Sequence, residues 1–215
     1  MNKLPSNRGF TLIELLVVIS LILVASSFIF IGGNPGSGAA LSSSTRIVSG
    51  IAQGARGQAI LKHAKTRLII HNDLDADADK YRRYFGIVYE SQPDSDEWIA
   101  ATQGTFLPEG IYFDPDLSAN HAWSTSATMT LEYPRTVAKA VGTGEVFYYY
   151  EFNRNGTAAS GFENDWLVLR AGTLRPDDAG DLDIVVEAEQ AAITSALILR
   201  RSGTTTMVND PDDIL

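Results

Sequence analysis

Glu14 is the residue near the start of the chain whose type and position call for a chemical explanation. It is the one charged side chain in an apolar run over residues 10–31, which reads FTLIELLVVISLILVASSFIFI. A carboxylate at the centre of a membrane helix costs roughly 2.5–3.5 kcal/mol on insertion scales, so it is a functional hypothesis that requires a partner. Phe10 lies four residues before Glu14 and therefore on the same helix face.

The apolar run is expected to form a helix that crosses a membrane. At 1.5 Å per residue, residues 10–31 make a helix of roughly 33 Å, which is enough to cross a bilayer. The segment before it, residues 1–9, carries Lys3 and Arg8 as its only charges. Positive charge ahead of an apolar helix keeps that end in the cytoplasm, so the later residues are expected outside it. No second run of this kind follows, and the sequence predicts one crossing.

Two simpler explanations of the apolar run are an ordinary secretory signal peptide and a plain signal anchor. A signal peptide would be cut near the small residues 25–27 or 38–40. Neither explanation accounts for the carboxylate of Glu14, which both leave without a partner.

The residues from Arg8 to Val18, RGFTLIELLVV, resemble the N-terminal signature of type IV pilins and pseudopilins. The resemblance implies that a prepilin peptidase cuts after Gly9, removing a leader of residues 1–9, and methylates the new N-terminal residue Phe10. It also implies that Glu14 pairs with the N-terminal amine of a neighbouring subunit. Such an α-amine has a reference pKa of roughly 7.7–8.0 and can carry a positive charge. Two buried opposite charges satisfy each other, so Glu14 would set the register between subunits in a filament.

Beyond the apolar run, the sequence predicts a flexible joint and then a second helix. Residues 32–44, GGNPGSGAALSSS, hold too many Gly and Pro residues for a continuous helix. Residues 45–65 return to helical spacing, and the expected apolar stripe is Ile47, Val48, Ile51, Ala52, Ala55 and Ala59. The small residues of this segment, its glycines included, are expected to let a sheet pack closely on this spine helix.

From Thr66 onward the apolar period changes to two, which predicts an antiparallel β domain over residues 66–215 packed on the spine helix. The fold class expected is α+β, of the pilin kind. The pair Asn155-Gly156 strongly indicates a tight turn between the strand before it and the next strand. The predicted strands are residues 66–71, 84–90, 98–102, 111–113, 128–133, 145–153, 166–171, 184–189 and 196–200.

Three short motifs make the chain similar to the GspH/FimT group of minor pseudopilins. They are Ala-Arg-Gly-Gln-Ala-Ile at residues 55–60, Leu-Pro-Glu-Gly at 107–110 and Phe-Asn-Arg-Asn-Gly at 152–156. The resemblance implies a C-terminal antiparallel β domain on the helix, which agrees with the period of two.

Other candidate sites have simpler explanations. Alternating aspartates at residues 73–79 could bind calcium, but the loop lacks the Gly and Glu that an EF-hand places at its sixth and twelfth positions. A solvated acidic loop is favoured, there and at the tail over residues 210–213. His63, His71 and His121 share no ligand spacing, and Tyr148, Tyr149 and Tyr150 are more typical of cross-strand packing than of a sugar platform.

The composition narrows the function further. The 215 residues carry a formal net charge of −9 and no cysteine, and the sequence pI is about 4.7. Disulfides, thiol nucleophiles and Cys-type zinc sites are excluded. The acidic balance argues against general nucleic-acid binding, which needs basic patches. The mean hydropathy of −0.02 averages a bilayer-length helix with a polar domain.

The sequence thus predicts a structural subunit rather than an enzyme, without a cofactor or metal. We expect it in the inner membrane, crossing once, with a periplasmic C-terminal domain. Expected partners are a prepilin peptidase, other pilin or pseudopilin subunits, an inner-membrane assembly platform and membrane lipid. Its filament is the pseudopilus of a type II secretion system or, alternatively, a type IV pilus in which it is a minor pilin. A membrane-anchored enzyme or binding module is the remaining alternative.

Overall fold

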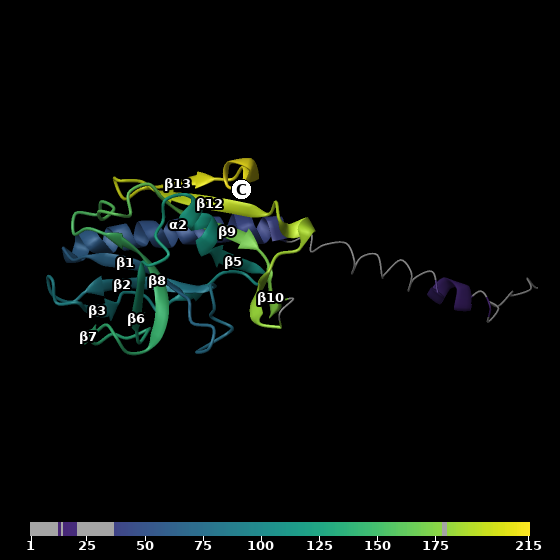
Figure 1. The fold of residues 1–215 in the computed structure, drawn as a ribbon, viewed down its shortest axis with the longest axis horizontal. Coiled ribbons are helices and arrows are strands. Elements are labelled where there is room, and N and C mark those ends of the chain that lie inside the picture. Colours follow the sequence, from purple (N-terminus) through teal and green to yellow (C-terminus); the bar gives the residue numbers. More distant parts are fainter. Residues whose placement is uncertain (1–12, 14, 21–36, 178–179) are drawn as a thin grey trace, which may run out of the picture. The chain divides into compact units, whose positions relative to one another are not determined.

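The computed structural model describes residues 13, 15–20, 37–177 and 180–215. The chain divides into two compact units, residues 1–35 and residues 36–215. In the first unit, Ile13 and residues 15–20 are helical. The second unit contains the long helix α2 and the strands labelled in Figure 1.

Helix α2 (Ser37–Lys62) begins before the predicted start at residue 45 and ends before residue 65. Residues 37–44 of the predicted joint are therefore helical, which corrects the sequence prediction, and residues 32–36 lie outside the described residues. Burial explains the longer helix, because Leu41, Ser44 and Thr45 are among its buried residues. The Ser44 hydroxyl donates to the Ala40 carbonyl at 2.7 Å and the Thr45 hydroxyl to the Leu41 carbonyl at 2.9 Å, so the polar groups bond within the helix. Leu41 is buried and anchors this first part to the domain.

The larger sheet of the second unit is antiparallel throughout. Within the described residues its strand order is β6-β8-β1-β2-β3-β7, with β4 also paired to β2. The strands are β1 (Thr66–His71), β2 (Tyr84–Glu90), β3 (Glu97–Ala100), β4 (Thr105–Phe106), β6 (Thr128–Leu131), β7 (Lys139–Ala140) and β8 (Glu145–Phe152). The central strand β1 pairs Leu68 with Ile87 of β2 and with Tyr150 of β8.

A second antiparallel sheet has the order β13-β12-β9-β5, and β10 pairs only with β11 in a separate hairpin. These strands are β5 (Ile111–Asp114), β9 (Asp165–Ala171), β10 (Thr173–Pro176), β11 (Leu182–Val185), β12 (Thr194–Leu199) and β13 (Thr205–Val208). Among the residues that the structure describes, the domain also has three short helical elements: α3 (Pro115–Asn120), η1 (Ala188–Gln190) and η2 (Pro211–Asp213).

The predicted antiparallel β domain is confirmed, with one strand placed wrongly. The predicted strand 184–189 is wrong in its second half, because β11 ends at Val185 and Glu187 caps η1 in a capping box with Gln190. Four strands were not predicted. Of these, β4 and β7 have two residues each and show no periodicity, and β10 and β13 are largely exposed and lack an apolar alternation.

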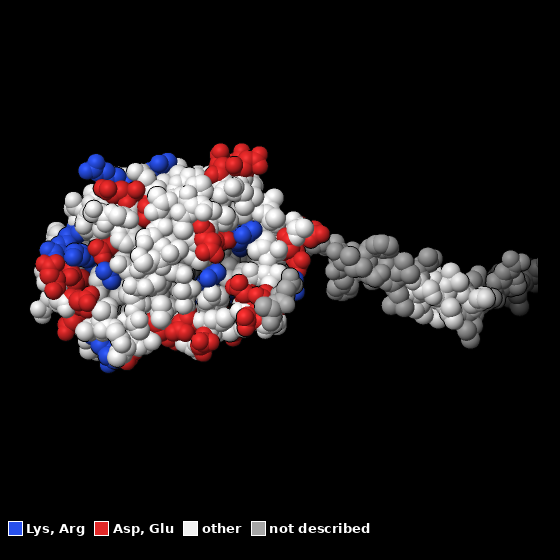
Figure 2. Space-filling view, in the orientation of Figure 1, with Lys and Arg blue, Asp and Glu red and all other residues white. Residues whose placement is uncertain are grey.

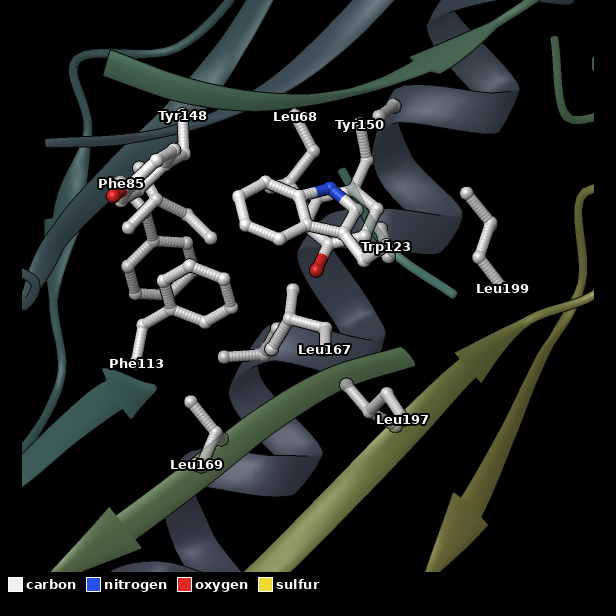
Figure 3. Packing of buried hydrophobic residues seen from close by; sticks show 14 of the residues in the cluster. Leu68, Phe85, Phe113, Trp123, Tyr148, Tyr150, Leu167, Leu169, Leu197 and Leu199 are labelled. Atoms are coloured by element: carbon white, nitrogen blue, oxygen red, sulfur yellow. The ribbon is translucent and has the colours of Figure 1, made fainter. Parts of the chain in front are cut away.

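The main core lies where α2 meets both sheets. Helix α2 contacts β1, β2 and β8 of the larger sheet and β5, β9, β12 and β13 of the smaller one. Its buried Ala52, Ala55 and Ala59 allow this close approach. Figure 3 shows side chains from both sheets pointing toward one another beside the helix, among them Leu68, Phe113, Tyr150, Leu169 and Leu197.

The opposite faces of the two sheets carry smaller clusters, as the alternation of side chains along a strand requires. On the larger sheet, Ile69, Val88, Trp98 and Phe147 pack together. On the smaller sheet, Val168 and Ala196 are covered by Ile214 of the C-terminal segment. Both sheets are therefore covered on their two faces over these residues.

The core makes a direct prediction about stability. Leu169→Ala removes a side chain that is 1% exposed, and we expect the free energy of unfolding to fall by about 2–5 kcal/mol. Leu182→Ala is the matched control, because Leu182 is 40% exposed. This substitution should change the free energy of unfolding by less than about 1 kcal/mol. Urea unfolding followed by tryptophan fluorescence measures both. Equal effects of the two variants would contradict the described core.

Candidate assembly surface

The three residues that the sequence singles out, Gly9, Phe10 and Glu14, lie outside the described residues. The described residues beside them are Ile13 and residues 15–20, which are helical. The large apolar side chains among these are between 50% and 70% exposed. The Ser20 hydroxyl donates to the Leu16 carbonyl at 2.8 Å, so its polar group is satisfied within the helix. This segment presents an apolar surface suited to lipid or to another apolar helix.

No helix among the described residues is both long and apolar enough to span a membrane. The predicted crossing over residues 10–31 falls mainly on residues that the structure does not describe.

Helix α2 has two opposite faces of different character. One face is buried against the sheets and includes Val48 together with the three core alanines. The exposed side chains on the other side recur at helical spacing, so they form a single stripe. We call this stripe the glycine face; it consists of Ser43, Ile47, Gly50, Gly54, Gly57 and Leu61.

The glycine face corrects two details of the sequence prediction. Ile47 was expected in the buried stripe and is instead 37% exposed. Gly50 and Gly57 were expected, together with the alanines, to let a sheet approach; the alanines do meet the sheets, whereas Gly50 and Gly57 are exposed. Gly54 is exposed too, although it lies beside the Ile87 side chain of β2. The apolar period alone did not separate the two faces, because small residues occur on both.

The domain itself does not require the glycines of this face. A Cβ atom added at Gly50 or at Gly57 would meet nothing within 4 Å, and one at Gly54 would only touch the Ile87 side chain at 3.4 Å. Glycine inside a helix destabilises it by roughly 0.5–1 kcal/mol relative to alanine. Gly50 and Gly54 have the spacing of the small-xxx-small pattern, which lets two helix backbones approach closely.

Polar side chains of α2 that lie beside the glycine face bond to the rest of the domain, and the glycine face itself stays uncovered. Ser49 lies 2.9 Å from the Thr205 hydroxyl, and the Gln53 amide donates to the same hydroxyl at 3.2 Å. Arg56 donates to the Gly156 carbonyl at 3.2 Å. These bonds orient the helix about its axis and so determine which side chains face outward.

The acidic loop over residues 73–79 makes contacts within the protein. Asp73 accepts from the amide of Val146 at 3.3 Å, and Asp77 pairs with Lys80 at 3.2 Å. Among the described residues, no group of three or more His, Cys, Asp or Glu side chains could hold a metal ion. Asp73 and Asp77 thus act as hydrogen-bond acceptors for the loop, and Asp73 also for β8.

The predicted histidines do not come together, and the tyrosines pack as cross-strand residues. His71 is buried, His121 stacks on Trp166 with ring centroids 4.0 Å apart, and His63 is exposed beyond the end of α2. Tyr148 and Tyr150 belong to the main core, as predicted for alternate residues of one strand.

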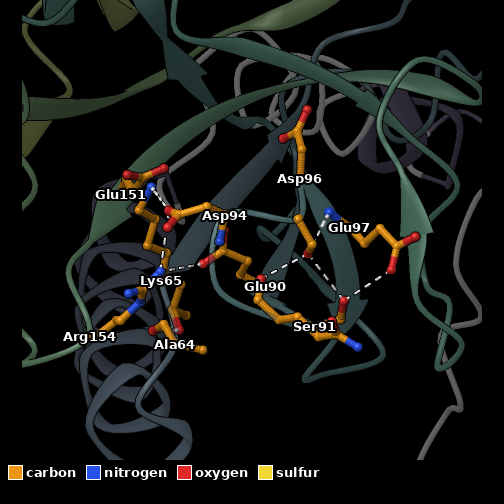
Figure 4. A network of polar contacts seen from close by, with 12 residues as sticks. Ala64, Lys65, Glu90, Ser91, Asp94, Asp96, Glu97, Glu151 and Arg154 are labelled. Atoms are coloured by element: carbon orange, nitrogen blue, oxygen red, sulfur yellow. Dashed lines mark hydrogen bonds and ion pairs between the residues drawn. The ribbon is translucent and has the colours of Figure 1, made fainter.

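A polar network at the C-terminal end of α2 was not foreseen from the sequence. Figure 4 shows Lys65 and Arg154 converging on Asp94, at 3.4 and 3.3 Å. Beneath them, the buried carboxylate of Glu90 accepts from the Asp94 amide at 2.7 Å and lies 3.4 Å from Arg154. These contacts fasten the loop between β2 and β3 to the end of α2. Their members are far apart in sequence and carry no spacing signal.

The surface charge of the domain is mixed but mainly acidic on the face seen in Figure 2. Inside the domain, burial raises the pKa of the Asp165 carboxyl to about 6. Its Oδ2 atom is buried without a hydrogen-bond partner. Burial also raises the pKa of Tyr133 to about 12, although the Thr102 hydroxyl at 2.8 Å offsets part of this rise. These groups are part of the packed interior and do not form a catalytic cluster with one another.

Comparison with known proteins gives a family match at the start of the chain. No curated protein sequence and no solved structure matches the chain. The family model for the prokaryotic N-terminal methylation motif matches residues 4–30. The matched segment contains Gly9, Phe10 and Glu14, whose roles in cleavage, methylation and assembly remain predictions. Residues 4–30 thus carry the prokaryotic N-terminal methylation motif, the signature of type IV pilins and pseudopilins.

Proposed function

We propose that this protein is a structural subunit of a pilin-type filament. The observation that carries the proposal is the methylation motif over residues 4–30, with Glu14 as the one charge of its apolar run. The single span would store the subunit in the inner membrane, with its N-terminus cytoplasmic and its β domain periplasmic. A prepilin peptidase would then cut after Gly9 and methylate Phe10. The amine of Phe10 in one subunit and the Glu14 carboxylate of another would pair as subunits stack.

The glycine face of α2 supports the same proposal. An exposed stripe of glycines is unfavourable for an isolated helix and favourable where another backbone comes close. In a filament, neighbouring subunits would supply that backbone, while the opposite face of α2 carries the β domain. The glycine face is therefore proposed as a lateral contact between subunits.

Within the pilin-type proteins, we propose a minor pseudopilin of a type II secretion system, which aids secretion across the outer membrane. The three GspH/FimT-like motifs support a minor subunit of either kind of filament, and they lie on α2, at the approach to β5 and at the turn after β8. A minor type IV pilin is the alternative. Deleting the gene separates the two: loss of exoprotein secretion supports the first, and loss of twitching with intact secretion supports the second.

Processing by a prepilin peptidase is the first prediction. Co-expression with the peptidase should shorten the chain by the nine residues of the segment 1–9 and add one methyl group to Phe10, because the motif places the cut after Gly9. Intact-mass spectrometry with and without the peptidase measures this. A chain that keeps Met1, or one cut after Ala25 as a signal peptide, would overturn the proposed function.

Glu14→Ala tests the role of the buried carboxylate. The variant leaves the N-terminal amine of a neighbour without a partner, and breaking a buried pair costs about 3–5 kcal/mol, or about 100-fold or more in incorporation. We expect it to be cleaved and to stay in the membrane fraction while being lost from sheared filaments. Normal incorporation of the variant would exclude charge pairing as the assembly mechanism.

Gly50→Leu tests the glycine face. A Cβ at this position meets nothing within 4 Å in the subunit, so stability should be unchanged or rise by about 0.5–1 kcal/mol, whereas incorporation should fall about tenfold or more. Gly38→Leu is the matched control, since it also meets open space but lies outside the glycine face. Quantitative immunoblots of filaments compare them, and equal incorporation of both variants would rule out this contact.

A further inference from the structure

His71 is a fully buried histidine inside a cluster of charged groups that the proposed assembly does not use. It ends β1 and is 0% exposed. Neither ring nitrogen has a hydrogen-bond partner, and the ring of Phe147 lies against it edge-on with centroids 5.3 Å apart. Buried polar groups are ordinarily hydrogen-bonded, so this imidazole requires an explanation.

The nearest charged group to His71 is the carboxylate of Glu145 at the start of β8. His71 Nε2 lies 3.3 Å from Glu145 Oε2. The same carboxylate holds Lys80, whose ammonium lies 3.0 Å from one oxygen and 3.3 Å from the other. The charged groups around the imidazole are Glu145 from β8 and Asp73, Asp77 and Lys80 from the loop between β1 and β2.

The segment that carries Lys80 is tied to β8 by few side-chain contacts, whereas Tyr81 at its end is buried in the domain. We call residues 73–81 the β1–β2 loop. Besides Lys80 and Glu145, its tie to β8 is the amide of Val146, which donates to Asp73 at 3.3 Å. The residue after the loop is fixed independently, because the amide of Arg82 donates to the His71 carbonyl at 2.9 Å and the Arg82 carbonyl accepts from Phe113 at 2.9 Å. The Lys80 carbonyl also accepts from the amides of Arg83 and Tyr84 at 3.0 and 2.9 Å. Opening of the loop therefore moves residues 73–79 and the Lys80 side chain, while the backbone from Lys80 onward stays in place.

We propose that His71 and Glu145 form an acid-operated latch for the β1–β2 loop. When the imidazole takes up a proton from solvent, both of its nitrogens become donors and its charge attracts the Glu145 carboxylate. Lys80 and the Nε2 atom of His71 then compete for the Glu145 carboxylate. The other imidazole donor, Nδ1, has no acceptor while the loop is closed. Opening the loop releases Lys80 to solvent, leaves Glu145 to His71 and lets water reach the other nitrogen.

The direction of the pH dependence follows from the environment of His71. Burial lowers the pKa of His71 below its usual 6.5, Glu145 offsets part of this fall, and Lys80 adds to it. The open state binds a proton more readily than the closed state, so the closed loop is fully stable above pH 6.5 and loses stability as the pH falls through the lowered pKa.

Hydrogen exchange of the full chain in detergent tests the latch. Peptides covering the β1–β2 loop are compared at pH 7.5 and pH 5.0, after correction for intrinsic rates, with β12 as the reference strand. Protection of the loop should fall about tenfold or more at pH 5.0, while β12 keeps its protection. Protonation of Asp165 on β9, with its raised pKa of about 6, stabilises the fold in acid and so cannot produce this fall.

Two variants separate the latch from general acid effects. His71→Leu keeps an apolar side chain against Phe147 and cannot titrate, so its loop should be equally protected at both pH values. His63→Leu is the matched control on an exposed histidine and should retain the acid effect of the parent chain. If His71→Leu does not fold, Lys80→Gln serves instead, because removing the Lys80 contact should loosen the loop at pH 7.5 as well. Equal protection of the parent loop at both pH values, or an acid effect that survives in His71→Leu, would overturn the proposal.

Discussion

The alanines of α2 are the constraint on which the domain depends. Ala52, Ala55 and Ala59 are the side chains through which one helix packs close against strands of two different sheets. Because these side chains are small, the space beside the helix is filled by large residues of the strands, among them Tyr150, Phe152 and Phe113. A larger residue in place of either of the fully buried alanines, 55 and 59, would push the sheets away from the helix, and interiors packed at crystal density do not absorb such a change without strain. This packing, together with the hydrogen bonds of Ser49, Gln53 and Arg56, fixes the orientation of α2 about its axis and with it the glycine face.

The sequence predicts the architecture well where its local signals agree with one another. Strands β1 and β2 were predicted at their observed limits, because apolar alternation and flanking turns agree there. The start of α2 was missed because composition made residues 37–44 a loop, whereas Leu41 is buried in the core and two hydroxyls bond back to the helix. The glycine face could not be foreseen, since deciding which side of a helix of small residues is covered requires the sheets. The network of Lys65, Glu90 and Arg154 is assembled from three separate segments, and nothing in their spacing indicates it.

Two buried ionisable groups give the domain opposite responses to acid. Asp165 has an oxygen without a partner and a raised pKa, so protonation relieves it. His71 has two nitrogens without partners and a lowered pKa, so protonation strains it. The two groups lie on different sheets, Asp165 on β9 and His71 on β1. Their effects on global stability therefore partly cancel, whereas the local effect at the β1–β2 loop comes from His71 and its charged neighbours. The domain can in this way keep its fold over a range of pH while one surface loop changes.

Several features of this chain are unfavourable for a single subunit and favourable for an assembly. A carboxylate within an apolar helix costs roughly 2.5–3.5 kcal/mol, and each interior glycine of α2 costs roughly 0.5–1 kcal/mol relative to alanine. The domain does not offset the second cost, since a Cβ at Gly50 or Gly57 would meet open space. The proposed filament would offset both, because a neighbouring amine would neutralise the carboxylate and a neighbouring helix backbone would occupy the space above the glycines. A membrane-anchored enzyme or binding module gains nothing from either feature. The pattern of local costs is thus an independent argument, beside the methylation motif, for a protein whose stable state includes its neighbours.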